Sequence, residues 1–227
     1  MSRYTCAEVA AVIDHSLLHP ALTDAELEAG CVSAAAWGVA AVCIKPFFVA
    51  RSVALLKGSG VKTAATVGFP HGGHAIAVKV AEARAAAEEG AQELDVVINI
   101  GKARGGDWGY LEDEIGALVE AGHHGGALVK VIFENCYLED EQKRRLCRIC
   151  KQAGADFIKT STGYGPGGAT DHDIRLMLEE AGATMGVKAA GGVRTYADAA
   201  RMMGMGVRRI GASQTEKMLA ECRAAGG

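Results

Sequence analysis

The chain of 227 residues is long enough to bury one large core, either as a single α/β barrel or as two small domains. Its formal net charge is −3, from 24 basic and 27 acidic residues, and no block of basic residues stands out, which argues against nucleic acid as a partner. No apolar run is long enough to span a bilayer, and the first residues contain no long apolar segment of the secretory type. We therefore expect a cytoplasmic protein without a membrane partner.

The first half of the chain alternates apolar, strand-like runs with Ala-rich, amphipathic runs. Strands are expected at 11–14, 40–44, 63–69 and 93–100, and helices at about 23–37, 49–56, 75–89 and 110–120. Thr23 to Glu26 forms a capping-box pattern at the start of the first of these helices. Gly90 follows the third helix in the position of a C-cap glycine.

The second half repeats this rhythm, with strands expected at 127–133, 155–163, 186–192 and 209–212. Helices are expected at 138–152 and from Thr170, Thr195 and Ser213, the last opening with another capping-box pattern. Strands that alternate strictly with helices form a parallel sheet, and eight such units in fewer than about 250 residues fit a compact (β/α)8 TIM barrel. Since no break in composition marks a linker, residues 1–227 are interpreted as one α/β domain, with a short extra helix at 5–10 that closes the bottom of the barrel.

Three lysines lie in register on consecutive apolar strands: Lys130, Lys159 and Lys188. A buried ammonium group loses its hydration, so it must be paired or lose its proton. Neighbouring strands lie about 4.8 Å apart, so inward-facing lysines on three adjacent strands would converge where barrels carry their active sites. Burial and like charge both lower the pKa of a lysine, and the free amine can then attack a carbonyl. The three lysines therefore predict a functional site.

Other polar residues lie in or just after the strands. Asp95 is on the strand before the lysines, either as a salt-bridge partner that neutralises one of them or as a group that relays protons through water. Asn99 shares the face of Asp95 by strand alternation and is expected to reach the same site. Asp14 either caps a loop or enters the site, and the sequence leaves both interpretations open. Cys43 completes this set of strand residues.

Two glycine-rich turns, 191–195 and 211–213, follow the last two strands. Barrels often bind phosphate with these loops and a helix N-terminus, because glycine lets backbone N–H groups approach an oxyanion. Ser213 is expected to cap the last helix and to contact the same anion, and tight turns without a ligand are the alternative. Residues 163–168 match the G-x-G-x-x-G pattern of dinucleotide sites, but the next strand ends without the acidic residue that would hold a ribose. We expect this loop to lend backbone amides to the phosphate site instead.

The histidines and cysteines predict neither a metal site nor a disulfide framework. Two histidine pairs lack a carboxylate or cysteine at metal-ligand spacing, namely His71 with His74 and His123 with His124. The seven cysteines are scattered, as is typical of reduced thiols, and Cys147 and Cys150 form a single C-x-x-C in a charged helical pattern. We therefore expect no metal and no cofactor.

With these motifs the sequence resembles the deoxyribose-phosphate aldolases, a family of class I, Schiff-base (β/α)8 enzymes. The matching stretches run nearly from end to end, at 13–18, 42–46, 66–70, 93–99, 128–134, 157–163, 187–194 and 209–213. The Lys-Thr-Ser-Thr-Gly run at 159–163 and the Val-Lys-Ala-Ala-Gly-Gly-Val-Arg run at 187–194 are together highly specific. The resemblance implies reversible cleavage of 2-deoxy-D-ribose 5-phosphate to acetaldehyde and D-glyceraldehyde 3-phosphate, as part of deoxyribose phosphate catabolism. It also implies a homodimer or a higher homo-oligomer.

The resemblance further implies a role for each matching residue. Lys159 would form the Schiff base with acetaldehyde. Lys188 would keep the pKa of Lys159 low and take part in proton transfer, and Asp95 would relay protons through water. Lys130 would complete the polar floor of the site. The remaining implied residues line the pocket (Asp14, Ser16, Cys43 and Thr162) or bind the substrate phosphate (Gly163, Gly191, Gly192, Arg194, Gly211 and Ser213).

Two features depart from the family pattern, and two other functions remain as alternatives. Many members end in a tail whose tyrosine assists proton transfer, whereas this sequence has no tyrosine after Tyr196, so another group or water is expected to serve that step. Gln214 stands where a second serine is often found, so that phosphate contact is not carried over.

The alternatives are a lysine-dependent aldolase for another phosphorylated carbonyl compound and a non-catalytic barrel that binds a sugar phosphate. The retained lysines argue against the second alternative.

Overall fold

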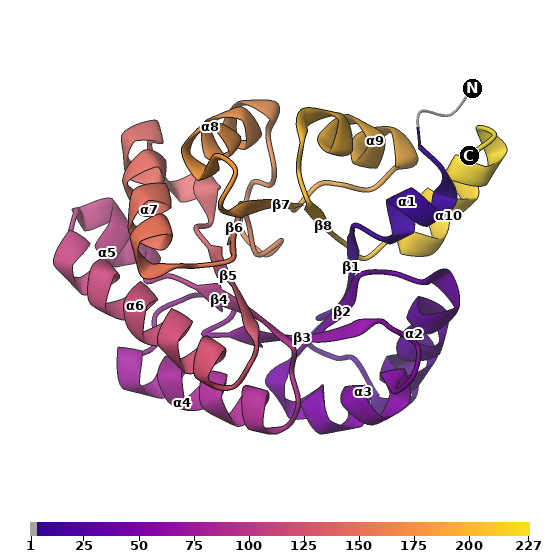
Figure 1. Cartoon of the computed structure of the whole chain (residues 1–227), viewed down its shortest axis with the longest axis horizontal. Coiled ribbons are helices and arrows are strands. Elements are labelled where there is room, and N and C mark those ends of the chain that lie inside the picture. The colour runs from indigo at the N-terminus through magenta and orange to yellow at the C-terminus, as the bar shows by residue number, and fades with distance from the viewer. Residues whose placement is uncertain (1–3) are drawn as a thin grey trace.

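The computed structural model describes residues 4–227, and within them eight parallel strands close into a barrel in the order of the sequence, with β1 pairing to both β2 and β8 (Figure 1). The strands are β1 (Ile13–Leu17), β2 (Ala41–Ile44), β3 (Lys62–Val67), β4 (Glu93–Val97), β5 (Leu128–Ile132), β6 (Phe157–Lys159), β7 (Gly186–Ala190) and β8 (Arg209–Ala212). The expected (β/α)8 TIM barrel is confirmed. No described helix has the length and apolar character needed to cross a membrane.

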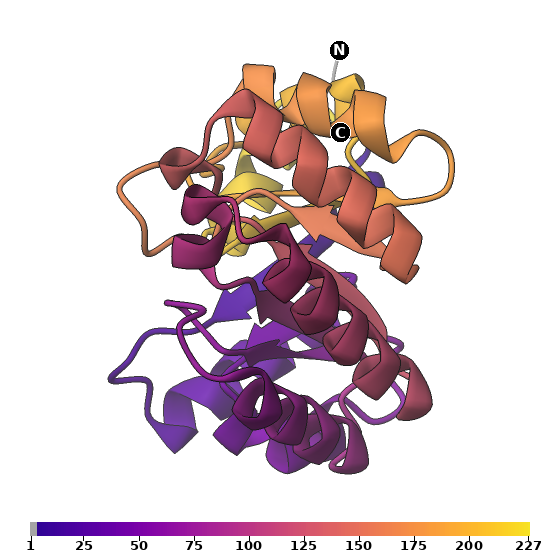
Figure 2. The same ribbon diagram turned by 90° about the vertical axis from the view of Figure 1, so that its left-hand side faces the viewer.

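Helices surround the barrel, as the turned view shows for α4 to α8 (Figure 2). They are α1 (Cys6–Ala10), α2 (Asp24–Trp37), α3 (Val49–Leu56), α4 (Ile76–Glu88), α5 (Ile100–Gly105), α6 (Trp108–His124), α7 (Asp140–Ala153), α8 (Asp171–Ala181), α9 (Tyr196–Met205) and α10 (Thr215–Ala224). The expected short helix before β1 is present as α1, which lies beside α10 in the outer ring (Figure 1). Apolar side chains between strands and helices form one continuous core, which is why the strands read as unbroken apolar runs.

Two expected strands are shorter than their apolar runs suggested. The run at 93–100 ends as strand at Val97, because the Asn99 side chain accepts a hydrogen bond from the Lys102 backbone N–H and begins α5. Asn99 is therefore a helix cap outside the site, and the expectation that it shares the site with Asp95 is wrong. The run at 155–163 forms strand only over the three residues of β6, and the residues after Lys159 turn over the mouth of the barrel.

The capping box expected at Ser213 is also wrong. The N-cap of α10 is Gln214, whose side chain makes no capping hydrogen bond. The hydroxyl of Thr215 lies 2.9 Å from Nδ1 of the buried His15 on β1, whose ring also packs edge-on against Trp37. This contact joins the start of α10 to β1, where a sequence pattern suggested a local cap.

Burial of His15 makes stability depend on pH. Burial lowers the pKa of this imidazole from 6.5 to about 4. Between these values the unfolded chain binds the extra proton, so stability present above pH 6.5 is lost as pH falls toward pH 4, by about 3 kcal/mol in full. Urea unfolding at steps across this window should show the loss, and His15→Asn, which cannot titrate, should flatten it. An equal pH dependence in both proteins would show that His15 is not the group responsible.

Candidate active site

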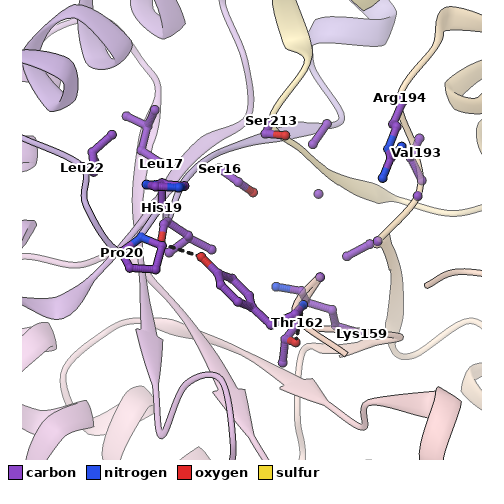
Figure 3. Close-up of a pocket in the computed structure, with 18 residues that line it drawn as sticks. Ser16, Leu17, His19, Pro20, Leu22, Lys159, Thr162, Val193, Arg194 and Ser213 are labelled. Carbon is purple, nitrogen blue, oxygen red and sulfur yellow. Dashed lines mark hydrogen bonds between the residues drawn. The ribbon is translucent and has the colours of Figure 1, made fainter. Parts of the chain in front are cut away.

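A cavity of about 500 Å³ opens at the carboxyl ends of β1, β6, β7 and β8 (Figure 3). Nine of the residues predicted from the sequence line it, namely Ser16, Lys159, Thr162, Gly163, Gly191, Gly192, Arg194, Gly211 and Ser213. The other five predicted residues lie buried inside the barrel, namely Asp14, Cys43, Asp95, Lys130 and Lys188. Lys159 belongs to both regions, because it lines the cavity while its side chain is only 4% exposed.

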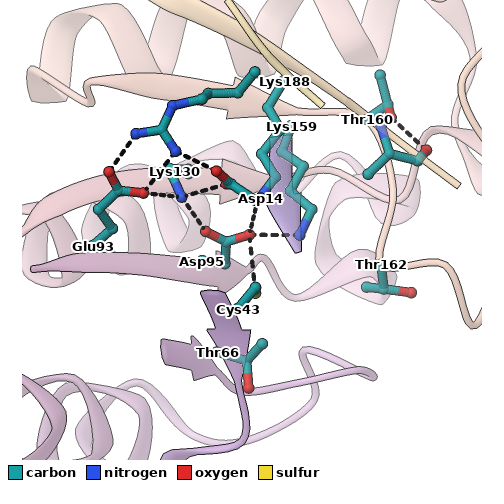
Figure 4. A network of polar contacts seen from close by, with 12 residues as sticks. Asp14, Cys43, Thr66, Glu93, Asp95, Lys130, Lys159, Thr160, Thr162 and Lys188 are labelled. Atoms are coloured by element: carbon teal, nitrogen blue, oxygen red, sulfur yellow. Dashed lines mark hydrogen bonds and ion pairs between the residues drawn. The ribbon is translucent and has the colours of Figure 1, made fainter. Parts of the chain in front are cut away.

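Asp95 is the centre of the buried group (Figure 4). Its Oδ2 accepts hydrogen bonds from Lys159 Nζ at 2.6 Å and from Lys188 Nζ at 2.7 Å. Its Oδ1 accepts one from Lys130 Nζ at 2.9 Å. The Cys43 thiol lies 3.8 Å from Oδ2. One carboxylate therefore holds three lysine side chains that come from three consecutive strands.

The three lysines converge from two levels of the barrel. Lys159 and Lys188 are register partners on β6 and β7, so their side chains leave the sheet at the same height. Lys130 on β5 is paired with Phe157, two residues before Lys159, and also with Asp95. The expectation that all three share one register is therefore wrong, although their amino groups do meet. Lys130 lies one layer deeper, beneath the cavity.

The surroundings give the lysines different proton affinities. Burial lowers the pKa of Lys159, and the charge of Lys188 lowers it further against the opposing attraction of Asp95. Burial also disfavours charge on Lys130 and Lys188, but their carboxylate neighbours outweigh it and raise the pKa of both. Burial alone would raise the pKa of Asp95, yet the three lysines hold it well below its usual range. Lys159 is thus the lysine of this group that most readily becomes a free amine.

Asp14 enters the site, which decides between the two interpretations of this residue. Its Oδ2 accepts hydrogen bonds from Lys188 Nζ at 2.5 Å and Lys130 Nζ at 2.9 Å. Burial opposes its ionisation, but Lys130, Lys188 and Arg209 together lower its pKa below the usual range. Cys43 behaves differently, because burial and then Asp95 raise the pKa of its thiol to about 11, so it stays neutral.

Sequence reasoning missed two charged residues in this group, Glu93 and Arg209. Glu93 lies two residues before Asp95 on the same face of β4, and its Oε2 is 2.5 Å from Lys130 Nζ. Arg209 donates through Nη1 to Asp14 Oδ1 and to Glu93 Oε2, the latter at 3.1 Å, and through Nη2 to Glu93 Oε1. The signal was present, since both are charged residues at the start of apolar strands, but the sequence analysis gave neither of them a role.

Glu134, just after β5, was also missed and holds the turn beside Lys159. It is the one non-glycine residue with positive φ in the described part of the chain, at φ 56° and ψ 62°. Its buried carboxylate accepts hydrogen bonds from the backbone N–H of Thr162, at 3.1 Å, and from the Thr162 hydroxyl. A side chain in this backbone region is strained, and such strain commonly accompanies function. The Glu134 carboxylate thereby fixes the turn that carries Thr162 and Gly163 into the cavity wall.

Tyr164 closes the cavity on one side, and no sequence pattern indicated it. Its hydroxyl donates to the Leu18 carbonyl at 2.7 Å, and its ring packs edge-on against Phe69. These contacts join the loops that follow β6, β1 and β3. Because the partners lie far away in sequence, local pattern gave no reason to select this tyrosine.

The glycine-rich turns form the wall opposite the lysines. Gly191 and Gly192 have φ values of 79° and 83°, which favour glycine and turn the chain into the N-cap of α9. A side chain at Gly168 would come within 2.3 Å of the Gly191 carbonyl oxygen, so the 163–168 loop packs directly on this turn. Arg194 and Ser213 extend from the two turns into the cavity (Figure 3). The exposed Gln214 follows Ser213 at the start of α10.

The residues set aside in the sequence lie away from this site. No group of three or more His, Cys, Asp or Glu side chains within residues 4–227 could hold a metal ion. Cys147 and Cys150 are buried in α7 as free thiols, and burial raises the pKa of both, that of Cys147 to about 12. His123 pairs with Asp156 on the outside of the barrel.

Comparison with known proteins agrees with this geometry. Residues 8–214 match the family described as DeoC/LacD family aldolase. The deoxyribose-phosphate aldolase of Rhodopirellula baltica is 51% identical over 223 residues, covering 98% of this chain and 92% of its own length. That of Caldanaerobacter subterraneus subsp. tengcongensis is 48% identical over 219 residues, covering 96% and 95%. The tetrameric structure of deoxyribose phosphate aldolase from Aeropyrum pernix superposes with a TM-score of 0.91 at 31% identity, covering 97% of this chain and 93% of that one.

Proposed function

Because this chain belongs to the DeoC/LacD aldolase family, within its deoxyribose-phosphate aldolases, we propose that Lys159 is the Schiff-base lysine of a class I aldolase. Its reaction is the reversible cleavage of 2-deoxy-D-ribose 5-phosphate to acetaldehyde and D-glyceraldehyde 3-phosphate. The observation that carries the assignment is the position of Lys159, a buried amine of lowered pKa at the floor of the cavity. No other lysine lines the cavity in the described part of the chain.

The first half of the reaction needs a free amine and a source of protons. The neutral Lys159 amine attacks C1 of the open-chain sugar and forms a carbinolamine, whose hydroxyl must be protonated to leave as water. Lys188 carries the proton nearest to this point, because its pKa is raised and its Nζ shares Asp95 Oδ2 with Lys159. Asp95 is assigned the relay of protons between them, since its Oδ2 contacts both amines. The product of these steps is a protonated imine at C1.

The second half breaks the C2–C3 bond. A base removes the proton of the C3 hydroxyl, the C2–C3 electron pair moves toward the imine, and glyceraldehyde 3-phosphate leaves. The remaining enamine on Lys159 takes a proton at C2, and water then hydrolyses the imine to release acetaldehyde and the free lysine. Lys130 and Asp14 have no hydrogen bond or ion pair to Lys159 in the described structure, and in this scheme they fix Lys188 and Asp95 from below through the contacts at 2.5–2.9 Å.

The substrate phosphate is assigned to the wall formed by the glycine turns. Gly163, Gly191, Gly192 and Gly211 offer close approach of the backbone, and Ser213 adds a hydroxyl. Arg194 supplies the positive charge, since its guanidinium points into the cavity (Figure 3). The cavity then holds the phosphorylated end of the sugar at β7 and β8 and its aldehyde end at β6.

Arg194→Ala tests the phosphate assignment. A charge-assisted hydrogen bond contributes about 1.5–3 kcal/mol, so KM for 2-deoxy-D-ribose 5-phosphate should rise about 10- to 100-fold with a smaller change in kcat. Steady-state kinetics measure both constants. The control is the trapping of acetaldehyde on Lys159, which involves no phosphate and should proceed at the unchanged rate. An unchanged KM would place the phosphate elsewhere in the cavity.

Reductive trapping tests the central assignment. Incubation with acetaldehyde and borohydride should add one ethyl group to the chain, and peptide mass spectrometry should locate it on Lys159. An adduct on a different lysine would reassign the nucleophile. The absence of any adduct, together with binding of the sugar phosphate, would favour the non-catalytic barrel that binds a sugar phosphate. Trapping of acetaldehyde without cleavage of the deoxyribose phosphate would favour an aldolase for another phosphorylated carbonyl compound.

Assembly and location complete the proposal. The Aeropyrum pernix structure is described as tetrameric, which supports a homo-oligomer here, with a dimer as the smallest unit consistent with the family expectation. We expect the enzyme to work in the cytoplasm on small phosphorylated sugars. It needs no cofactor in this scheme, because the protonated imine formed on Lys159 is itself the electron sink of the reaction.

A further inference from the structure

In the ion-paired network inside the barrel, basic groups outnumber acidic groups. Within residues 4–227, four basic side chains belong to the buried network: Lys130, Lys159, Lys188 and Arg209. Three carboxylates belong to it: Asp14, Glu93 and Asp95. On β2 the facing group is the neutral Cys43 thiol, and on β3 it is the uncharged Thr66 (Figure 4). If every basic group is protonated and every carboxylate ionised, one positive charge of this network has no opposite charge within the network.

An uncompensated charge in a buried volume is costly, and losing one proton from the network removes it. Arginine cannot provide that proton, because its guanidinium stays charged in proteins. The proton must therefore leave a lysine. Lys130 contacts three carboxylates and Lys188 contacts two, whereas Asp95 is the single carboxylate that pairs with Lys159 in the described structure. Lys159 is the lysine that loses least by becoming neutral.

Arg209 is the group that creates the excess. Its guanidinium is bound to Asp14 and Glu93, and its side chain is 13% exposed. It does not line the cavity, so it does not contact the substrate. A chain of contacts joins it to the nucleophile, from Asp14 to Lys188 at 2.5 Å, from Lys188 to Asp95 at 2.7 Å, and from Asp95 to Lys159 at 2.6 Å.

We propose that Arg209 is a positioning residue that keeps Lys159 a neutral amine, by occupying Asp14 and Glu93 with a charge that cannot be lost. The proposal rests on the proposed function, because it concerns the amine that attacks the aldehyde. In this arrangement the lysine neighbours are one source of the low proton affinity of Lys159, and the permanent charge below them is the other. Glu93 has the opposite influence, since it supplies one of the three compensating charges.

The test is the pH dependence of acetaldehyde trapping on Lys159, measured with cyanoborohydride and peptide mass spectrometry. Imine formation needs the free amine, so the midpoint of the profile follows the pKa of Lys159. Arg209→Met removes a positive charge and should move the midpoint up by about one pH unit, the order expected for a charge that acts across the buried network at an effective dielectric constant near 20. Glu93→Gln removes a negative charge and should move it down by a similar amount.

The double variant Arg209→Met with Glu93→Gln separates charge from structure. It leaves three basic groups and two carboxylates, the same excess of one, so its midpoint should return close to that of the unsubstituted chain. Arg209→Lys keeps a positive charge at this position, so its midpoint should stay close to that of the unsubstituted chain. The matched control is Arg208→Met, because Arg208 is the exposed neighbour on the same strand end, packed over the ring of Phe157. Its charge lies in solvent, so the midpoint should not move.

The outcomes are distinct. Midpoints that move in opposite directions for the two single variants and return in the double variant support the proposal. A folded Arg209→Met with an unchanged midpoint, or single variants that move in the same direction, would overturn it. If Arg209→Met does not fold, as judged by circular dichroism, the downward movement in Glu93→Gln and the return in the double variant decide the question. Absence of the Lys159 adduct in the unsubstituted chain would instead overturn the proposed function.

Discussion

Lys159→Met is expected to lower kcat for cleavage of 2-deoxy-D-ribose 5-phosphate by at least about 10⁴-fold, the order of loss seen when a covalent nucleophile is removed. Methionine fills nearly the same volume but has no amine, so no carbinolamine can form. The other two lysines cannot replace it, because both are held protonated by two or more carboxylates and neither lines the cavity. Coupled assay of the glyceraldehyde 3-phosphate released measures the loss.

The folded state should tolerate this change, since Asp95 keeps two of its three lysine partners. Lys102→Met is a suitable control, because Lys102 lies at the surface in a pair with Asp107 and has no part in the site. It should leave kcat unchanged. Residual turnover in Lys159→Met above one part in a thousand, or an acetaldehyde adduct on Lys188 of that variant, would contradict the assignment.

Asp95→Asn is expected to reduce both turnover and stability. The amide has nearly the same shape but cannot take up a proton, so kcat should fall about 10²- to 10⁴-fold, the range for loss of a general acid–base. It also leaves three buried lysines without their shared carboxylate, and breaking a buried pair in this way costs about 3–5 kcal/mol. Acetaldehyde should still be trapped on Lys159. The charge of Asp95 raises the pKa of this lysine, so removing it favours the free amine that attacks the aldehyde. Kinetics, urea unfolding and trapping measure the three effects.

Glu114→Gln provides the matched control for the stability loss. Glu114 is a fully buried carboxylate paired with Lys79 at 2.8 Å between the helices outside the barrel, and it also accepts the Asn99 backbone N–H at 2.7 Å. Like Asp95→Asn, this variant removes one buried negative charge. It should therefore reduce stability by a comparable amount while kcat changes little. If Glu114→Gln lowered kcat as much as Asp95→Asn, the effect of Asp95 on turnover would be structural and not chemical.

The sequence was sufficient to predict the features of the fold and of the site that depend on local pattern. Alternation of apolar runs and amphipathic helices gave the barrel, and the bounds of α3 and β8 were predicted to the residue. Lys159, Lys188 and Asp95 were found because a charge in an apolar strand is rare and needs an explanation. Burial of these residues in one cluster follows from their position on the inner face of neighbouring strands.

The features that escaped prediction depend on contacts between distant parts of the chain. From the sequence, Arg209 is simply a polar residue at the start of a strand. Its partners Asp14 and Glu93 are 195 and 116 residues away, and only the folded barrel brings them into contact with it. Thr215 reads as part of a capping box until His15 is placed beside its hydroxyl. Strand β6 is short because the chain must leave the sheet after Lys159 to form the cavity wall, and β-propensity of the Thr-Ser-Thr run does not express that requirement.

The charges inside the barrel are divided between the two halves of the chain. Strands β1 to β4 contribute only the acidic members of the network, on β1 and β4, and strands β5 to β8 contribute only the basic ones, one from each strand. A fragment ending after β4 would bury like charges that repel one another, and so would a fragment beginning at β5. Each half therefore supplies the charges that neutralise those of the other, so the buried lysines acquire their carboxylate partners only when the barrel closes. A partly folded chain with an open sheet would contain neither a neutral cluster nor a reactive amine.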